Sequence, residues 1–263
     1  MIAINGNIIN QNHFPDKSLL VKYNPLNQGI NDIEWKYESD AEIFTLYCLK
    51  RHLDDAYIGG RTRLIMQYIP HARQDRCKRD EDVFTLKYFS EIINSLKFDE
   101  VDVLDPHSPV SEALINNIVV DTAEDYIKQI INDDYDDEEE FVIFYPDNGA
   151  YKKYTDFIKA PSCYGVKNRD WETGKIIGLD VITNGIDLKG KRILMIDDII
   201  SYGGSMYYSA KKLKELGCGD IYIYASHIEN SILEGDLIKS GLFKQIYTTN
   251  SLFSGEHELI KIL

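Results

Sequence analysis

Short apolar runs alternate along the chain with segments in which apolar residues recur at spacings of three and four. Residues 141–145 are apolar without alternation, which is typical of a strand with both faces buried in a parallel sheet. Residues 82–97 have a helical period, with Leu86, Phe89 and Ile93 on one face, and predict an amphipathic helix. The pattern also predicts helices over residues 122–132 and 203–216, and strands over residues 63–69, 100–105, 192–195, 220–226 and 245–249.

This order of strands and helices predicts an α/β fold with parallel sheets covered by helices. The composition changes near residues 121–140, where an acidic run occupies residues 133–140. We interpret the run as a solvated loop, because like charges resist the folded geometry of a metal site. The change in composition predicts two domains, residues 1–121 and 122–250, followed by a C-terminal tail at residues 251–263.

The composition is that of a soluble globular protein with an ordinary core. Of the 263 residues, 44% are hydrophobic and 27% are charged, which argues against a disordered or fibrous chain. No apolar run approaches the roughly 20 residues that span a bilayer, and the N-terminus does not resemble a secretory signal. The four cysteines form neither a disulfide framework nor a zinc pattern, so we expect a cytoplasmic protein that contacts no membrane.

The formal net charge of −14 restricts the ligands. An acidic surface repels phosphate backbones, so we expect no nucleic-acid partner. A small phosphate ligand would need cations gathered locally or a bound metal.

Residues 185–191 have the spacing of a Walker A motif without its context. A P-loop follows a strand, opens a helix and ends in Ser or Thr. Here Arg192 follows, and the segment leads into a predicted strand, so we interpret it as a surface turn. The sequence contains no Gly-x-Gly-x-x-Gly, so a Rossmann dinucleotide site has no support.

The strongest local signal runs from residue 193 to residue 205 (ILMIDDIISYGGS). A predicted buried strand ends in Asp197 and Asp198, and a glycine-containing loop then opens a helix. Ligands of open parallel sheets bind at the carboxyl ends of strands, and helix N-termini bind phosphate. Two adjacent carboxylates suit vicinal hydroxyls or a hydrated Mg²⁺. The segment predicts a sugar-phosphate site; the alternative is an ordinary strand-to-helix turn with an Asp N-cap.

The segment resembles the phosphoribosyl-diphosphate loop of type I phosphoribosyltransferases and of ribose-phosphate pyrophosphokinases. Residues 68–76 (YIPHARQDR) separate the two families, because they resemble the pyrophosphokinase motif Pro-Tyr-x-x-Tyr-x-Arg-Gln-Asp-Arg with two residues fewer. The resemblance to the ribose-phosphate pyrophosphokinase family runs from about residue 14 to residue 250. Its other matching segments, in the family's order, are residues 14–16, 105–107, 146–150, 166–169, 226–227 and 247–250.

The resemblance implies two similar phosphoribosyltransferase-like domains, each a parallel sheet flanked by helices. It implies an ATP site between them and against a neighbouring subunit, and therefore a homo-oligomer. The implied partners are ATP and a ribose 5-phosphate-type acceptor, and the implied cofactor is Mg²⁺. In the implied reaction the ribose C1 hydroxyl attacks the β-phosphorus of Mg-ATP, and AMP leaves.

The resemblance also implies roles for individual residues. Lys167 and Arg169, expected on a mobile lid beyond a strand, and His107 would act in catalysis, and His107 and Asp147 would hold Mg²⁺. The implied ATP-binding residues are Phe14, Asp16, Arg73, Gln74 and His107. The implied ribose-phosphate-binding residues are Asp197, Asp198, Ser201, Tyr202, Gly203, Gly204 and Ser205.

The chain departs from the family in three places. Lys17 and Ser18 replace Gly-Glu, Glu81 replaces an Arg, and the phosphate loop reads Ser-Tyr-Gly-Gly-Ser instead of Asp-Thr-Gly-Gly-Thr. Because Tyr202 is much larger than Thr, one alternative is an acceptor such as ADP-ribose, which presents a diphosphate and an aromatic base there. Two further alternatives are a phosphoribosyltransferase that consumes the activated sugar and a non-catalytic regulatory homologue.

Overall fold

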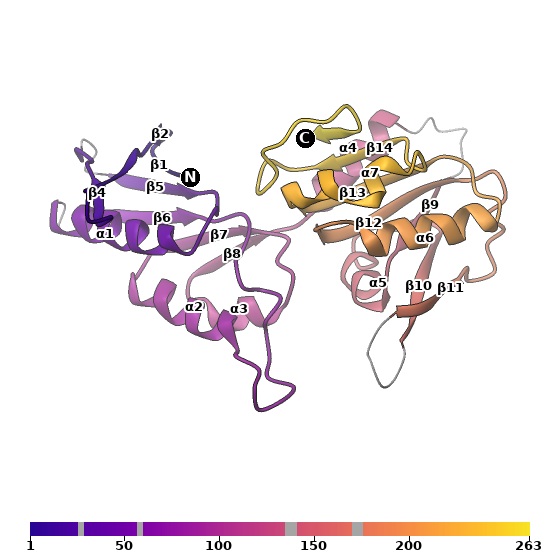
Figure 1. The fold of residues 1–263 in the computed structure, drawn as a ribbon, viewed down its shortest axis with the longest axis horizontal. Coiled ribbons are helices and arrows are strands. Elements are labelled where there is room, and N and C mark those ends of the chain that lie inside the picture. Colours follow the sequence, from indigo (N-terminus) through magenta and orange to yellow (C-terminus); the bar gives the residue numbers. More distant parts are fainter. Residues whose placement is uncertain (26–28, 57–59, 135–140, 170–175) are drawn as a thin grey trace. The chain divides into compact units, whose positions relative to one another are not determined.

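The computed structural model describes residues 1–25, 29–56, 60–134, 141–169 and 176–263. The chain forms two compact units, Met1–Thr122 and Ala123–Leu263 (Figure 1). Each unit contains a largely parallel sheet with helices packed against it, which confirms the predicted α/β class.

The first unit contains a six-stranded sheet of order β2-β1-β5-β6-β7-β8. Strands β5 to β8 are parallel, and β1 is antiparallel to both β2 and β5. A separate hairpin consists of β3 and β4. The strands are β1 (Ile2–Ile4), β2 (Asn7–Ile8), β3 (Gln11–His13), β4 (Leu19–Val21), β5 (Ile30–Trp35), β6 (Arg61–Ile65), β7 (Glu100–Leu104) and β8 (Ile118–Asp121), and the helices are α1 (Ala41–Ala56), α2 (Thr85–Ser95) and α3 (Val110–Leu114).

Alternation along the strands gives this sheet one apolar face and one charged face. Leu64 of β6 lies in a core with Leu49 of α1 and Phe89 of α2. On the preceding residue of β6, the Arg63 guanidinium lies 2.9 Å from Asp32 and 3.4 Å from Asp102. Burial raises the pKa of Asp102 to about 6, against the opposing effect of Arg63.

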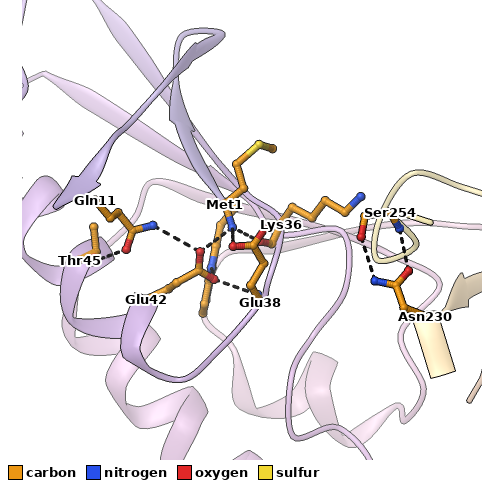
Figure 2. A network of polar contacts seen from close by, with 9 residues as sticks. Met1, Gln11, Lys36, Glu38, Glu42, Thr45, Asn230 and Ser254 are labelled. Atoms are coloured by element: carbon orange, nitrogen blue, oxygen red, sulfur yellow. Dashed lines mark hydrogen bonds and ion pairs between the residues drawn. The ribbon is translucent and has the colours of Figure 1, made fainter. Parts of the chain in front are cut away.

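A polar network around the buried Glu42 joins the start of α1 to the first strands (Figure 2). Its carboxylate accepts hydrogen bonds from the Met1 ammonium group, from Trp35 Nε1 at 3.0 Å and from the Glu38 amide at 2.9 Å. Burial raises the pKa of Glu42, but these donors outweigh burial and leave the pKa below its usual value. Polar side chains therefore fix this end of the first unit.

The second unit contains a seven-stranded sheet of order β11-β10-β9-β12-β13-β14-β15. All neighbours are parallel except β10 and β11, which form a hairpin. The strands are β9 (Phe141–Tyr145), β10 (Ser162–Arg169), β11 (Ile176–Ile182), β12 (Arg192–Ile200), β13 (Ile221–Ile228), β14 (Gln245–Thr248) and β15 (Ile260–Ile262). The helices are α4 (Glu124–Asp134), α5 (Asn148–Tyr154), α6 (Gly204–Glu215), the 3₁₀ turn η1 (Asn230–Glu234) and α7 (Asp236–Lys239).

Both faces of this second sheet are buried. Met195 of β12 packs with Met206 of α6 on one face, and Leu194 packs with Tyr154 of α5 on the other. All eight residues of β13 are buried, as expected for a central strand covered on both sides. Asn230, the first residue of η1, exchanges hydrogen bonds at 2.8 and 3.0 Å with Ser254 in the loop that leads to β15 (Figure 2).

Several elements differ in extent from their expected ranges. The helix expected over residues 82–97 is α2, which begins only at Thr85, and β6 ends at Ile65 because the chain then turns toward residues 70–76. Part of the expected C-terminal tail instead forms β15, which pairs with β14. Residues 185–191 form the turn that leads into β12 and not a P-loop, with positive φ angles at Gly185 and Gly190.

All four cysteines lie in the described part of the chain, and none forms a disulfide. No helix among the residues that the structure describes is long and apolar enough to cross a membrane. Most of the acidic run lies outside the described residues.

Candidate functional site

In the first unit, a hydrogen bond joins two motif segments that follow neighbouring parallel strands. Residues 66–84 follow β6, and residues 105–109 follow β7. The Ser108 hydroxyl donates to Asp75 Oδ2 at 2.7 Å, and Arg76 donates to both Asp75 oxygens at 2.6 and 2.7 Å. The Arg76 hydrogen bonds lower the pKa of Asp75 to about 2, with burial opposing and Ser108 assisting. The bond therefore ties the segment of Arg73 and Gln74 to the segment of His107.

Backbone and side-chain contacts hold Gln74 in a defined orientation. The backbone amide of Gln74 donates a hydrogen bond to the His71 carbonyl at 2.9 Å. The side-chain oxygen of Gln74 accepts a hydrogen bond from the Thr85 hydroxyl at 2.8 Å. Thr85 begins α2, so the loop is fastened to the helix that follows it. Gln74, Arg73 and His107 are all exposed, as is required of side chains that meet a ligand.

His71 is a positioning candidate that the motif match did not identify. Its φ of +65° places it in the left-handed region, which non-glycine residues rarely adopt. His71 Nε2 lies 2.9 Å from Asp40 Oδ1, and the Tyr37 hydroxyl donates to the same oxygen at 2.9 Å. Burial, and then the hydrogen bond to Asp40, raise the pKa of Tyr37 to about 12. These contacts connect the start of the Arg73–Gln74 loop to the residue that precedes α1.

Phe14 and Asp16 lie on the separate β3–β4 hairpin and not in the network around Asp75. The Phe14 side chain is 49% exposed. Asp16 Oδ1 accepts hydrogen bonds from the Ser18 amide at 3.0 Å and hydroxyl at 2.6 Å, which lower the Asp16 pKa. Lys17 has a φ of +69°, a conformation that favours glycine. Lys17 therefore adopts, with some strain, the left-handed conformation that a glycine at this position would adopt easily.

In the second unit, acidic residues gather at the carboxyl ends of β9 and β12. The parallel register pairs Phe144 of β9 with Met195 of β12. Asp147 and Asp198 each lie three residues after these partners. Asp197 Oδ1 accepts the Asp198 amide at 3.0 Å, and Asp198 Oδ1 accepts the Ile199 amide at 2.9 Å. Burial, and then the charges of Asp198 and Asp147, hold the pKa of Asp197 well above its usual range. The structure thus brings these three predicted side chains together.

Asp147 has a second, structural task at this position. Its side chain is the N-cap of α5 and accepts the Gly149 and Ala150 amides at 3.0 and 3.2 Å. Within the described ranges, no three His, Cys, Asp or Glu side chains are grouped so that they could hold a metal ion alone. The carboxylate oxygens nevertheless fit Mg²⁺, which is commonly held by one or two carboxylates together with substrate oxygens.

The loop between β12 and α6 is held by close packing around two glycines. Gly203 has a φ of +79°, and a Cβ there would lie 2.5 Å from Leu237 Cδ1. A Cβ on Gly235 would lie 2.1 Å from the Tyr202 carbonyl oxygen. Both positions therefore require glycine, and the backbone of the loop is confined before any ligand arrives.

Side chains of this loop differ in their exposure. Gly203 is the N-cap of α6 and provides no side-chain cap to the helix, whose first residues are Gly204 and Ser205. The first-turn amides of such a helix attract anions. The Tyr202 side chain is 58% exposed beside them.

Glu229 is a further residue that sequence reasoning missed. Its carboxylate accepts the Ser201 hydroxyl at 2.7 Å and the Ser231 hydroxyl at 3.2 Å, just beyond the end of β13. The signal that could have found it is its place after a strand that runs parallel to β12. The loop therefore has a carboxylate next to its first residue.

Lys153 is a third functional candidate that the sequence analysis did not identify. It lies on α5, and its Nζ is 3.8 Å from Asp198 Oδ2. No local sequence signal marks Lys153, because its contact with Asp198 joins two elements that are distant in sequence.

The backbone of Lys167 and Arg169 belongs to β10, which pairs with β11 through Lys167–Leu179 and Arg169–Ile176. These residues were expected on a lid beyond a strand, whereas the antiparallel pairing places their backbone within the hairpin. Their side chains lie outside the described part, as do residues 170–175.

The late motif segments form a buried polar network at the ends of β13 and β14. The Ser226 carbonyl accepts the Thr249 hydroxyl at 2.7 Å and the Ser251 hydroxyl at 3.1 Å. His227 is 2% exposed, and its Nδ1 lies 2.8 Å from Ser251 Oγ. We therefore interpret residues 226–227 and 248–251 as support for the strand ends.

Comparison with known proteins finds ribose-phosphate pyrophosphokinases among the sequence relatives of the chain. No family model matches the chain. The chain is 27% identical over 239 residues to a ribose-phosphate pyrophosphokinase of Saccharolobus solfataricus, covering 86% of this chain and 77% of that protein. It is 26% identical over 236 residues to the Pyrococcus abyssi enzyme of the same name, covering 86% and 79%.

The fold has a counterpart among solved structures. The phosphoribosylpyrophosphate synthetase of Mycobacterium smegmatis superposes with a TM-score of 0.80 at 19% identity, covering 97% of this chain and 85% of that one. This likeness shows that the two chains share an α/β fold. The sequence relatives and the structural neighbour confirm the resemblance found from the motifs.

Proposed function

Because the chain resembles the ribose-phosphate pyrophosphokinases over 86% of its length, we propose that it transfers the β,γ-diphosphate of ATP to the C1 hydroxyl of ribose 5-phosphate. The products are then AMP and phosphoribosyl diphosphate. The observation that carries the proposal is the hydrogen bond between Ser108 and Asp75. It ties Arg73, Gln74 and His107 into one group, and a simple phosphoribosyltransferase has no need of such a group.

In the proposed reaction the first unit binds the nucleotide. The Arg73 guanidinium is suited to phosphate oxygens or to stacking on a base, and the Gln74 amide to hydrogen bonds with a base edge. Phe14 and Asp16 on the hairpin add contacts to the adenosine. His107 acts close to the phosphates that are transferred.

The second unit binds the acceptor. Asp197 and Asp198 orient the ribose hydroxyls, because two adjacent carboxylates can accept hydrogen bonds from a vicinal diol. The 5′-phosphate is held by the loop of residues 201–205 and the first-turn amides of α6. Ser201 and Ser205 add hydroxyl donors to those amides.

The transfer makes one bond and breaks one. The C1 oxygen bonds to the β-phosphorus, the bond from that phosphorus to the α,β-bridging oxygen breaks, and the hydroxyl proton is released. Lys167 and Arg169 offset the charge of the transferring group, an effect worth several kcal/mol per well-placed cation. His107 and Asp147 would contribute ligands to Mg²⁺, which supplies charge neutralisation on the phosphates.

A second candidate is the same transfer to a ribose whose 5′-phosphate carries a nucleotide, such as ADP-ribose. Two observations favour it. The exposed Tyr202 ring at the loop offers a surface on which a base can stack. The Glu229 carboxylate at the Ser201 hydroxyl would repel a bare phosphate dianion more strongly than a diphosphate diester.

A side-by-side assay separates these functions. The protein is mixed with Mg²⁺ and ATP and with ribose 5-phosphate, ADP-ribose or ribose, and AMP release is followed together with the mass of the new product. A product heavier than one of the two phosphorylated acceptors by a diphosphate group identifies the acceptor. ATP-independent release of diphosphate from phosphoribosyl diphosphate would indicate a phosphoribosyltransferase. No AMP with any acceptor would indicate a non-catalytic homologue.

The proposed function carries two further expectations. A contact from Phe14 and Asp16 to the adenine of a neighbouring subunit requires a homo-oligomer. The reaction and the four unpaired thiols fit a reducing, ATP-containing cytoplasm.

A further inference from the structure

Lys153 reaches from α5 toward the second of the two adjacent aspartates. Its Nζ lies 3.8 Å from Asp198 Oδ2, where the Asp198 side chain is 8% exposed and the Lys153 side chain 30%. Ala150 and Tyr154 anchor α5 in the core that also contains Leu194 and Ile196 of β12. The lysine is thereby presented to the strand by a packed helix and not by a loop.

The Lys153 ammonium group has a second contact within its own helix. Its Nζ lies 5.3 Å from the centroid of the Tyr154 ring, within the range of a cation–π contact. Lys152, the preceding residue, is exposed on the same helix. The two adjacent lysines therefore differ in their exposure and in the contacts that Lys153 makes with Tyr154 and Asp198.

The carboxylates around Lys153 need a cation. Asp147, Asp197 and Asp198 crowd the ends of β9 and β12, in a chain with a net charge of −14. A nearly buried carboxylate that loses its cationic partner is strongly destabilised and turns away or becomes neutral. Asp198 Oδ1 already accepts the Ile199 amide, so a cation at Oδ2 fixes both oxygens of this carboxylate.

We propose that Lys153 is a positioning residue for the acceptor, which holds the Asp198 carboxylate in the orientation that receives the ribose hydroxyls. The inference rests on the proposed function, in which Asp198 binds the acceptor and the first unit binds ATP. Lys153 itself does not touch the reacting atoms. Its removal should therefore weaken acceptor binding and leave ATP binding unchanged.

The test compares Lys153→Met, Lys153→Arg and the matched control Lys152→Met. Methionine keeps an apolar stem over Tyr154 and removes the charge. We expect Lys153→Met to raise the KM for the acceptor about 10-fold and to change the KM for ATP less than twofold. Lys153→Arg should restore the acceptor KM to within about threefold, and Lys152→Met should match the wild type.

A double-mutant cycle with Asp198→Asn adds a readout that a purely structural role would not move. If Lys153 acts through Asp198, Lys153→Met should have little further effect on the acceptor KM in the Asp198→Asn protein. Additive effects of the two substitutions would overturn the inference. So would equal increases in the KM values of acceptor and ATP, or a Lys153→Met protein that behaves like Lys152→Met.

Calorimetric titration with ribose 5-phosphate and with ADP-ribose distinguishes a failure of the proposed function from a failure of the inference about Lys153. If the wild type forms no AMP with any acceptor, the proposed function fails. The binding affinities then still test Lys153, because Lys153→Met should bind the preferred ribose phosphate about 10-fold more weakly than Lys152→Met. Equal affinities of the two variants, or no binding by the wild type, would overturn the inference.

Discussion

The two half-sites are built in different ways. In the first unit, the segments of Gln74 and His107 are joined by the side-chain hydrogen bond from Ser108 to Asp75. In the second unit, the phosphate loop is confined by backbone packing against Leu237 and Gly235. Side-chain hydrogen bonds exchange readily with water, whereas close packing leaves no such substitute. The nucleotide half-site should therefore tolerate substitution better than the acceptor half-site.

The largest expected effect comes from placing a methyl group in the packed loop. Gly203→Ala adds a Cβ 2.5 Å from Leu237 Cδ1 at a φ of +79°. We expect the free energy of unfolding to fall by about 3 kcal/mol and acceptor binding to weaken at least about 100-fold, because strain and overpacking combine. Urea unfolding and the acceptor KM measure the two effects.

Gly185→Ala is the matched control for that substitution. Gly185 has a φ of +82°, but its added Cβ would meet no atom within 4 Å. Only the conformational cost of about 1 kcal/mol should appear, with activity unchanged. If both alanine variants lose the same stability and activity, close packing does not confine the loop.

The next effect concerns the side-chain network that fixes the first unit. Glu42→Gln removes the negative charge that accepts hydrogen bonds from the Met1 ammonium group, Trp35 Nε1 and the Glu38 backbone amide. We expect this change to lower the free energy of unfolding by about 2 kcal/mol at pH 7. Folding lowers the pKa of Glu42, so its contribution is present above the unfolded carboxyl pKa of about 4.3. The contribution is lost as the pH falls through the lower, folded pKa.

Urea unfolding of the wild type and the variant at pH 7 and near pH 3 checks the sign. The stability difference should shrink at the lower pH. Glu38→Gln is the control, because the Glu38 side chain is 66% exposed and its ion pair with Met1 should contribute little. A difference that grows on acidification would contradict the assigned direction of the pKa shift.

The smallest effect tests the link between the two nucleotide segments. Ser108→Ala removes the hydroxyl that donates to Asp75 at 2.7 Å, and should raise the KM for ATP about fivefold, equivalent to about 1 kcal/mol. The acceptor KM should stay unchanged. Ser108→Thr keeps a hydroxyl and should recover most of the loss, and Ser95→Ala, on the exposed end of α2, should be silent. An unchanged KM for ATP in Ser108→Ala would remove the bond from the nucleotide site.

Sequence patterns could predict the parts of the fold that depend on local signals. The apolar run at residues 141–145 forms β9, and the Asp197–Asp198 segment forms the end of β12. Several elements had no such signal. The strand β15 has only three residues and is defined by its pairing with β14. The β10–β11 hairpin is defined by the antiparallel pairing of its two strands.

The candidate site divides in the same way. Asp197, Asp198 and the glycines that follow could be predicted, because one strand-loop-helix segment holds them all. The sequence analysis missed Lys153 and Glu229, because each reaches the site from a different element through a contact that is distant in sequence. The left-handed conformation of His71 was also hidden, since nothing in a short motif reports a φ of +65°.

The unequal lengths of β9 and β12 have a consequence for how a ligand is accommodated. β9 pairs with β12 only as far as Met195 and ends before Pro146, which lacks the N–H that a further ladder bond would need. β12 continues to Ile200 beside β13, so its last five residues extend beyond the part that pairs with β9. Because ligands of parallel sheets bind at the carboxyl ends of strands, we expect a bound ligand to lie beside this end of β12. Extending β9 by design should therefore block the position beside the end of β12 and leave the rest of the sheet intact.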